Sequence, residues 1–327
     1  MEKAVGVLEA YELQIVKTLK GRGSLLVETN QGTKILKEYP ASMAKVELQD
    51  TLQKQITDHA VCTVDSFVRN KEGSLITVDQ MGIPYVLKDY PTGRECELKN
   101  PEDLKLAAKT LAHIHDSMQL KNACTVKSGV LSMREEFSRH TKQLNKIYEY
   151  TRGQGTKTEF ELNLLMIFRQ FYEQADEVSK CMNDFPEEMY NEEIAKLCQY
   201  GHGEYIHHNI LIQGKKISVI NFEKFRPMSR IRDLSQFMRK SLEKNNWNVE
   251  LGLLILQSYE NEYKLSKLDL QCLYYRLAYP EKFFKVVNHY YNTNKVMISN
   301  KNIEKLRALV CQSETKAIFL KELNRYR

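Results

Sequence analysis

The sequence predicts an α+β fold with two lobes: a small antiparallel-sheet lobe over about residues 1–90 and a larger, mainly helical lobe over about residues 91–327. Three observations lead to this prediction. The first ninety residues contain short apolar runs separated by turns, which is typical of strands. After Pro91 the apolar residues recur at helical spacing, and one β insertion at 205–221 interrupts the helices.

The first lobe is expected to contain five strands and one helix. Two apolar runs flank the turn Asn30-Gln31-Gly32, a pattern that indicates a β-hairpin. The helix is predicted at 43–60, where apolar residues recur every three or four positions. The five strands are predicted at 25–29, 33–39, 61–68, 75–78 and 83–90.

The second lobe begins with a well-marked helix start at Asn100-Pro101-Glu102-Asp103, which combines a capping Asn, an initial Pro and acidic residues in the first turn. Ser266 and Asp269 have the spacing of a capping box. Further helices are predicted at about 131–150, 157–182, 187–198, 230–245, 247–264, 266–277, 280–292 and 300–323.

Composition limits the classes of protein that remain. The 327 residues are 42% hydrophobic and 28% charged, as in ordinary globular domains. No apolar run approaches the ~20 residues of a membrane span, and the first residues lack the apolar core of a secretory signal. The seven cysteines are odd in number and widely spaced, so we expect no disulfide framework and a reducing cytoplasm.

The net charge of +6 is mild, but an equal excess lies within 215–240, where eight basic residues meet two acidic ones. This stretch could be a solvated helix face with a hairpin turn. It could also bind an anionic substrate or an acidic partner. Nucleic acid is not expected, because the basic residues do not alternate with aromatic ones.

The residues with the clearest chemistry lie in and just after the β insertion. Phosphoryl transfer needs a carboxylate that orients the nucleophile and oxygen ligands for Mg²⁺ on a neighbouring strand. Glu204 and Asn209 have the five-residue spacing of a kinase catalytic loop, and Asn221-Phe222-Glu223 follows where the metal-binding strand should be. Asp233 is placed to anchor the loop backbone.

Three histidines, His202, His207 and His208, are close in this segment. Neighbouring side chains on a loop usually diverge, so a zinc site is not expected from them. His202 is expected to be structural and to hydrogen-bond the loop backbone.

Together with Lys37 in the β-rich first lobe, this loop resembles the choline kinase and aminoglycoside phosphotransferase group of kinase-like folds. Other segments, spread over nearly the whole chain, resemble more closely the CotS family of bacterial spore coat proteins. They are Tyr90–Cys96, Asn100–Asp103, Leu111–His115, Leu242–Trp247, Tyr279–Phe283 and Asn288–Tyr291.

The resemblance implies roles for individual residues. It implies that Lys37, Glu47 and Tyr90 bind the nucleotide cofactor, with Glu47 as the helix partner of Lys37. Glu204, Asn209 and Asp233 take the catalytic positions, and Asn209, Asn221 and Glu223 would hold the metal. ATP and Mg²⁺ are the cofactors if the protein is active.

Two departures from the family pattern concern the principal acids. Glu204 replaces the usual catalytic Asp and extends its carboxylate further, and Asn221 offers Mg²⁺ a neutral amide in place of a carboxylate. These changes favour a spore coat or spore-assembly protein that is degenerate in phosphotransfer. The alternative is an active phosphotransferase that acts on a small hydroxyl-bearing molecule or a coat component.

The resemblance also implies where the protein is made, where it is finally located and what it binds. The protein would be synthesised in the cytoplasm of a spore-forming bacterium and then enter the spore coat. Its partners would be other coat proteins or an anionic small molecule, with no nucleic acid and no membrane span.

Overall fold

The computed structural model describes residues 6–21, 23–120, 132–293 and 301–326. The chain divides into two compact units, residues 1–119 with 200–226 and residues 120–199 with 227–327. The predicted lobe boundary at residue 90 falls inside the first unit and stays a prediction.

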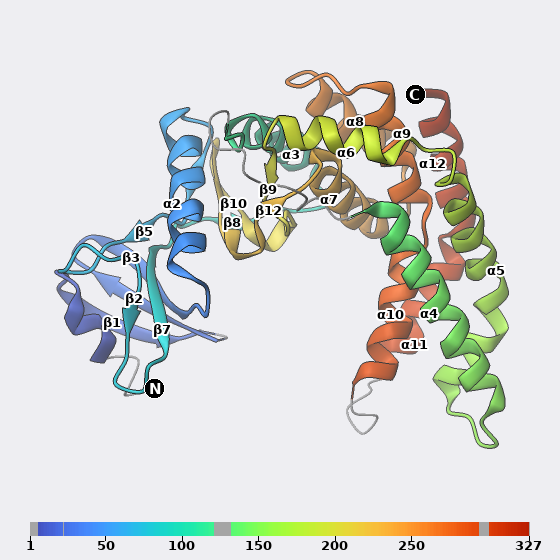
Figure 1. The fold of residues 1–327 in the computed structure, drawn as a ribbon, viewed down its shortest axis with the longest axis horizontal. Coiled ribbons are helices and arrows are strands. Elements are labelled where there is room, and N and C mark those ends of the chain that lie inside the picture. The colour runs from blue at the N-terminus through green and yellow to red at the C-terminus, as the bar shows by residue number, and fades with distance from the viewer. Residues whose placement is uncertain (1–5, 22, 121–131, 294–300, 327) are drawn as a thin grey trace. The chain divides into compact units, whose positions relative to one another are not determined.

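A six-stranded antiparallel sheet forms the N-terminal part of the first unit, with strand order β1-β2-β3-β7-β5 and β6 paired to β7. Figure 1 shows these strands in blue to cyan, with helix α2 (Met43–Asp58) beside them. The strands are β1 (Ile15–Lys20), β2 (Ser24–Thr29), β3 (Gly32–Glu38), β5 (Phe67–Val68), β6 (Thr77–Val78) and β7 (Pro84–Asp89). A short helix, η1 (Leu8–Ala10), precedes them.

The predicted hairpin is confirmed, with Thr29 opposite Gly32 and Ser24 opposite Lys37. Gly32 has φ +90°, a conformation that glycine adopts without a Cβ clash. Five strands were expected, and the strand β1 was missed. All six of its residues are exposed, so its sequence has no buried face that would produce alternation.

The single strand predicted at 61–68 is wrong, because the chain there forms two short strands in different sheets. β4 (Thr63–Val64) pairs in parallel with β11 (Lys216–Val219), whereas β5 pairs with β7. The chain changes sheets at Asp65 and Ser66, and the Asp65 side chain is buried.

The second sheet of this unit contains the β insertion predicted at 205–221. Its order is β4-β11-β10-β8, where β10 is Ile210–Gln213 and β8 is Arg94–Glu95. The short helix η2 (His207–Asn209) leads into β10, and η3 (Phe222–Lys224) follows β11. Helix α3 (Pro101–Ser117) begins as predicted, with the Asn100 side chain accepting a hydrogen bond from the Glu102 backbone. Two further short strands, β9 (Tyr200–Gly201) and β12 (Arg226–Pro227), lie close by in the sequence.

The described part of the second unit is helical, and α4 and α5 run side by side as a pair (Figure 1). The predicted capping box at Ser266 and Asp269 is confirmed at the start of α9. The helix expected at 300–323 is two helices that meet at Gln312, and the expected starts at 131 and 300 lie outside the described residues. The helices are α4 (Met133–Gly153), α5 (Glu159–Cys181), α6 (Glu187–Lys196), α7 (Arg230–Lys244), α8 (Val249–Glu260), α9 (Lys267–Ala278), α10 (Glu281–Asn292), α11 (Lys301–Cys311) and α12 (Ser313–Tyr326).

Two expectations from composition can be compared with the fold. In the described part of the chain, no helix has the length and apolarity needed to cross a membrane. Among the described residues, five cysteines are free thiols and Cys198 is disulfide-bonded, a bond that the spacing of the cysteines did not indicate.

Candidate functional site

The centre of the candidate site is the ammonium group of Lys37 on β3. Lys37 donates a short hydrogen bond to the amide oxygen of Asn221 and lies 3.3 Å from Oε1 of Glu223. Lys37 is more than 180 positions from both Asn221 and Glu223 in the sequence, and all three belong to the first unit. The structure therefore brings the predicted phosphate-binding lysine to two of the three predicted metal ligands.

Asn209, the third predicted ligand, adjoins the same group. Asn221 Nδ2 donates to Asn209 Oδ1 over 2.8 Å, and Asn209 Nδ2 donates to the backbone oxygen of Glu204 over 2.9 Å. The Asn209 side chain therefore ties the start of the loop to the residue that follows β11. The hydrogen bond from Asn209 to Glu204 closes the loop between these two residues, which are five positions apart.

Asn221 has left-handed backbone angles, φ 67° and ψ 54°, which Asn tolerates better than most residues. Its backbone N–H donates to Asp65 Oδ2 over 3.0 Å. Asp65 also accepts from Gln53 Nε2 on α2 over 2.8 Å. A buried carboxylate therefore fixes the turn that presents the Asn221 side chain.

Sequence reasoning missed the second lysine of the site. Lys88 on β7 has a fully buried side chain, and its Nζ lies 2.7 Å from Asp65 Oδ2 and 3.6 Å from Glu223 Oε1. A lone lysine in a strand usually extends to solvent, so nothing at that position indicated burial. The available signal was Asp65 itself, a charged residue in the middle of an otherwise apolar strand prediction.

Two groups have pKa values that reflect this environment. Burial acts to raise the pKa of Glu223, but the nearby cations Lys88 and Lys37 outweigh it, and the pKa is lowered. Burial also raises the pKa of the Tyr39 phenol, with further contributions from Glu223 and Asp65. Glu223 is therefore ionised near neutral pH, and Tyr39 keeps its proton.

The other predicted site residues have the following contacts and positions. Glu204 forms an ion pair with Lys224 over 2.8 Å. Glu47 is exposed on α2, and the structure does not bring it to Lys37. The Tyr90 backbone N–H donates to Thr33, just after β7. Asp233 is 1% exposed and lies on α7 in the second unit.

His202 has the structural role that the sequence predicted. Its ring is completely buried, with Nδ1 accepting from the Glu204 backbone N–H over 3.1 Å. Nε2 lies 3.0 Å from the Ile220 carbonyl oxygen, to which it donates in the neutral tautomer. The imidazole therefore braces the loop between β9 and η2.

The basic stretch at 215–240 is not one solvated surface. Arg230 and Arg239 are buried, and Arg230 lies 3.7 Å above the ring of Tyr263. Arg232 makes two hydrogen bonds to Glu136. Three of the eight basic residues therefore serve packing and ion pairing within the second unit, whereas Lys215, Lys216 and Lys224 are exposed.

Comparison with solved structures identifies the fold class, a kinase-like phosphotransferase fold. The aminoglycoside phosphotransferase from Alicyclobacillus acidocaldarius matches with a TM-score of 0.88 at 18% identity, covering 98% of this chain and 95% of that one. An AMP-bound spectinomycin phosphotransferase matches with a TM-score of 0.69 at 10% identity, covering 94% of each chain. The amicoumacin kinase hAmiN, in complex with AMP-PNP and Ca²⁺, matches with a TM-score of 0.62 at 15% identity over 96% of this chain and 92% of that one.

A family model described as "Spore coat putative kinase YutH" matches residues 6–323. The chain belongs to this family of spore coat proteins, which confirms both predicted resemblances, to spore coat proteins and to the aminoglycoside phosphotransferase group. A search of curated proteins found no match.

Proposed function

We propose that this protein is a spore coat or spore-assembly component that uses a kinase-like fold for binding and has lost efficient phosphotransfer. The observation that carries the proposal is the charge balance around Asn221. Lys37 and Lys88 supply two positive charges, and Asp65 and Glu223 supply two negative ones, all within the contacts described above.

A Mg²⁺ site needs hard oxygen ligands and benefits from negative charge that is not already compensated. Asn209, Asn221 and Glu223 offer oxygens of the right kind, so the donor set fits the ion chemically. However, the two amides are neutral, and both lysines oppose the single carboxylate among the three. A carboxylate at 221 would leave the group with one surplus negative charge, and Asn removes it.

Glu204 supports the same conclusion. Its carboxylate is engaged by Lys224, and a phosphotransferase would need that group to orient the acceptor hydroxyl. The pair is partly exposed, with the Lys224 side chain 63% exposed, so solvent screens it. Glu204 is therefore a secondary argument beside the charge balance at Asn221.

The alternative function is an active ATP- and Mg²⁺-dependent phosphotransferase for a small hydroxyl-bearing substrate or a coat component. One observation favours it: Lys37, Asn209, Asn221 and Glu223 meet in one hydrogen-bonded group, although they come from three separate segments. Nucleotide complexes of similar structures show that the fold can accommodate such ligands in other proteins.

Titration of ATP by calorimetry, with and without Mg²⁺, separates the two functions. We expect wild-type protein to show no Mg²⁺-dependent ATP binding. Asn221→Asp should introduce it, while Asn163→Asp on α5 adds the same charge far along the chain and serves as the control. Mg²⁺-dependent ATP binding by the wild type that disappears in Lys37→Ala would overturn the charge-balance argument, and ATP-dependent phosphorylation of an acceptor would establish the alternative.

The location is tested separately. We expect the protein to be recovered in the coat fraction of purified spores by immunoblotting, as the family description suggests. Recovery only in the spore core or the mother-cell cytoplasm would contradict the coat assignment.

A further inference from the structure

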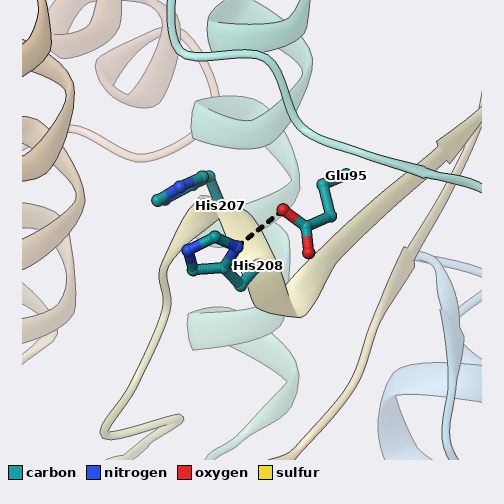
Figure 2. A group of neighbouring side chains, drawn as sticks. All are labelled: Glu95, His207 and His208. Carbon is teal, nitrogen blue, oxygen red and sulfur yellow. Dashed lines mark hydrogen bonds and ion pairs between the residues drawn. The ribbon is translucent and has the colours of Figure 1, made fainter.

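Next to the catalytic-type loop, His207, His208 and Glu95 form a cluster with the chemistry of a transition-metal site. One ligand atom from each residue lies within 4.8 Å of the other two. Figure 2 shows the two imidazoles on the turn of η2 and the Glu95 side chain reaching toward His208 from the neighbouring strand. The expectation that these neighbouring histidines diverge is wrong, because the 3₁₀ turn places their ring centroids 3.8 Å apart.

We propose that Glu95, His207 and His208 bind one Zn²⁺ ion, with the fourth coordination position open to water or to a ligand from another molecule. Two imidazoles and a carboxylate are a known three-ligand set for zinc. Imidazole is a poor ligand for Mg²⁺, so this site is distinct from the oxygen-rich group around Asn221 and does not depend on the proposed function.

The backbone holds the three residues at this separation. Glu95 on β8 pairs with Leu211 on β10, directly after η2, and the Cys96 backbone N–H donates to Ile210 over 2.9 Å. The ligands therefore lie on two elements joined by a sheet ladder. This arrangement limits the entropy that metal binding must remove.

Zinc binding requires the three side chains to adjust, because their ligand atoms lie within 4.8 Å of one another without all having the separation of a tetrahedral site. Ligand bonds of about 2.1 Å in a tetrahedral site place ligand atoms about 3.4 Å apart. His208 Nδ1 and Glu95 Oε2 are 2.6 Å apart and would separate slightly as the ion enters between them. The side chains of His208 and Glu95 are 58% and 55% exposed, so neither is locked by packing.

Zinc binding would stabilise a functional segment. His208 is adjacent to Asn209, whose side chain bonds both Asn221 and the Glu204 backbone. An ion that links β8 to η2 would restrain the loop that positions Asn209. Coordination would replace the single exposed hydrogen bond between His208 and Glu95 with three metal bonds.

The test is calorimetric titration of the full-length protein with Zn²⁺, beside Glu95→Gln and His208→Ala. We expect the wild type to bind one Zn²⁺ and each variant to lose at least about 10-fold in affinity. His59→Ala removes an exposed histidine whose ring contacts Ser117 and should leave binding unchanged. Glu95→Gln keeps the size of an exposed side chain, and an unchanged thermal melt without metal verifies its fold.

Co²⁺ provides a second readout, because a tetrahedral site with nitrogen and oxygen ligands gives intense visible absorption that Glu95→Gln should abolish. Excess Mg²⁺ should not displace Zn²⁺. Absence of stoichiometric Zn²⁺ binding would overturn the proposal. So would zinc affinity that survives unchanged in both Glu95→Gln and His208→Ala, because the ion would then bind at another group, such as the exposed thiols Cys181 and Cys311.

Discussion

Replacing Lys88 with Met tests the buried charge group most directly. The Lys88 and Asp65 side chains are 0% and 2% exposed, and their charged atoms are 2.7 Å apart. Met retains most of the volume of Lys but leaves the Asp65 carboxylate without its buried cation. Removing one partner of a buried ion pair costs about 3–5 kcal/mol of stability.

The contacts of Asp65 place the expected loss at the lower end of that range. Asp65 keeps its hydrogen bonds from Gln53 and from the Asn221 backbone N–H, so two donors still face the carboxylate. We therefore expect Lys88→Met to lower the free energy of unfolding by about 3 kcal/mol. Adding Asp65→Asn should recover part of the loss, because it removes the uncompensated charge.

Urea denaturation followed by circular dichroism provides the measurement. Lys54→Met is the control, since Lys54 pairs with Asp50 over 2.7 Å but its side chain is 60% exposed. That pair should contribute less than about 1 kcal/mol. A loss below about 1 kcal/mol in Lys88→Met as well would refute the reasoning, since it would mean that the Lys88–Asp65 pair is solvated like a surface pair.

Two further predictions concern other parts of the first unit. Gly203→Ala should destabilise the protein by about 3 kcal/mol in urea denaturation, because φ is +81° and the new Cβ would collide with the Lys224 carbonyl oxygen. Gly214→Ala, at φ +61° in open space, should cost only about 1 kcal/mol, and equal costs would contradict the clash. The Arg94 hydrogen bond lowers the pKa of Asp103. A lowered carboxyl pKa stabilises the fold above the unfolded value of about 4, and that stability is lost as pH falls through the folded value. Melting temperatures measured below pH 4 should therefore fall less steeply in Arg94→Gln than in the wild type, and identical acid profiles would exclude the pair as a contributor.

The predictable parts of the fold are those whose signal is local. The turn at Asn30-Gln31-Gly32, the cap at Asn100 and the box at Ser266 each satisfy backbone groups within four residues, so the sequence shows the complete interaction. The strand β1 has no buried face and produces no such signal.

The candidate site was predictable only in part, for a related reason. Lys37, Asn209, Asn221 and Glu223 could be named from spacing and resemblance, and they do meet. Lys88 could not be named, because its partner Asp65 is 23 residues away in the sequence. The two residues meet because the chain passes from one sheet to the other at Asp65. Glu95 is 113 residues from His208, so only the β8–β10 ladder reveals that cluster.

Lys88→Met also separates two explanations of why Asn221 would disable phosphotransfer. Asn221→Asp and Lys88→Met each leave the group around Glu223 with one surplus negative charge, the first by adding an anion and the second by removing a cation. If charge balance alone excludes Mg²⁺, both variants should gain Mg²⁺-dependent ATP binding. If the ion requires a carboxylate ligand at position 221, only Asn221→Asp should gain it, because Lys88→Met supplies no new oxygen. Failure of both would show that neither the charge nor the ligand at 221 is what limits the site, and the charge-balance argument for a degenerate phosphotransferase would have to be abandoned.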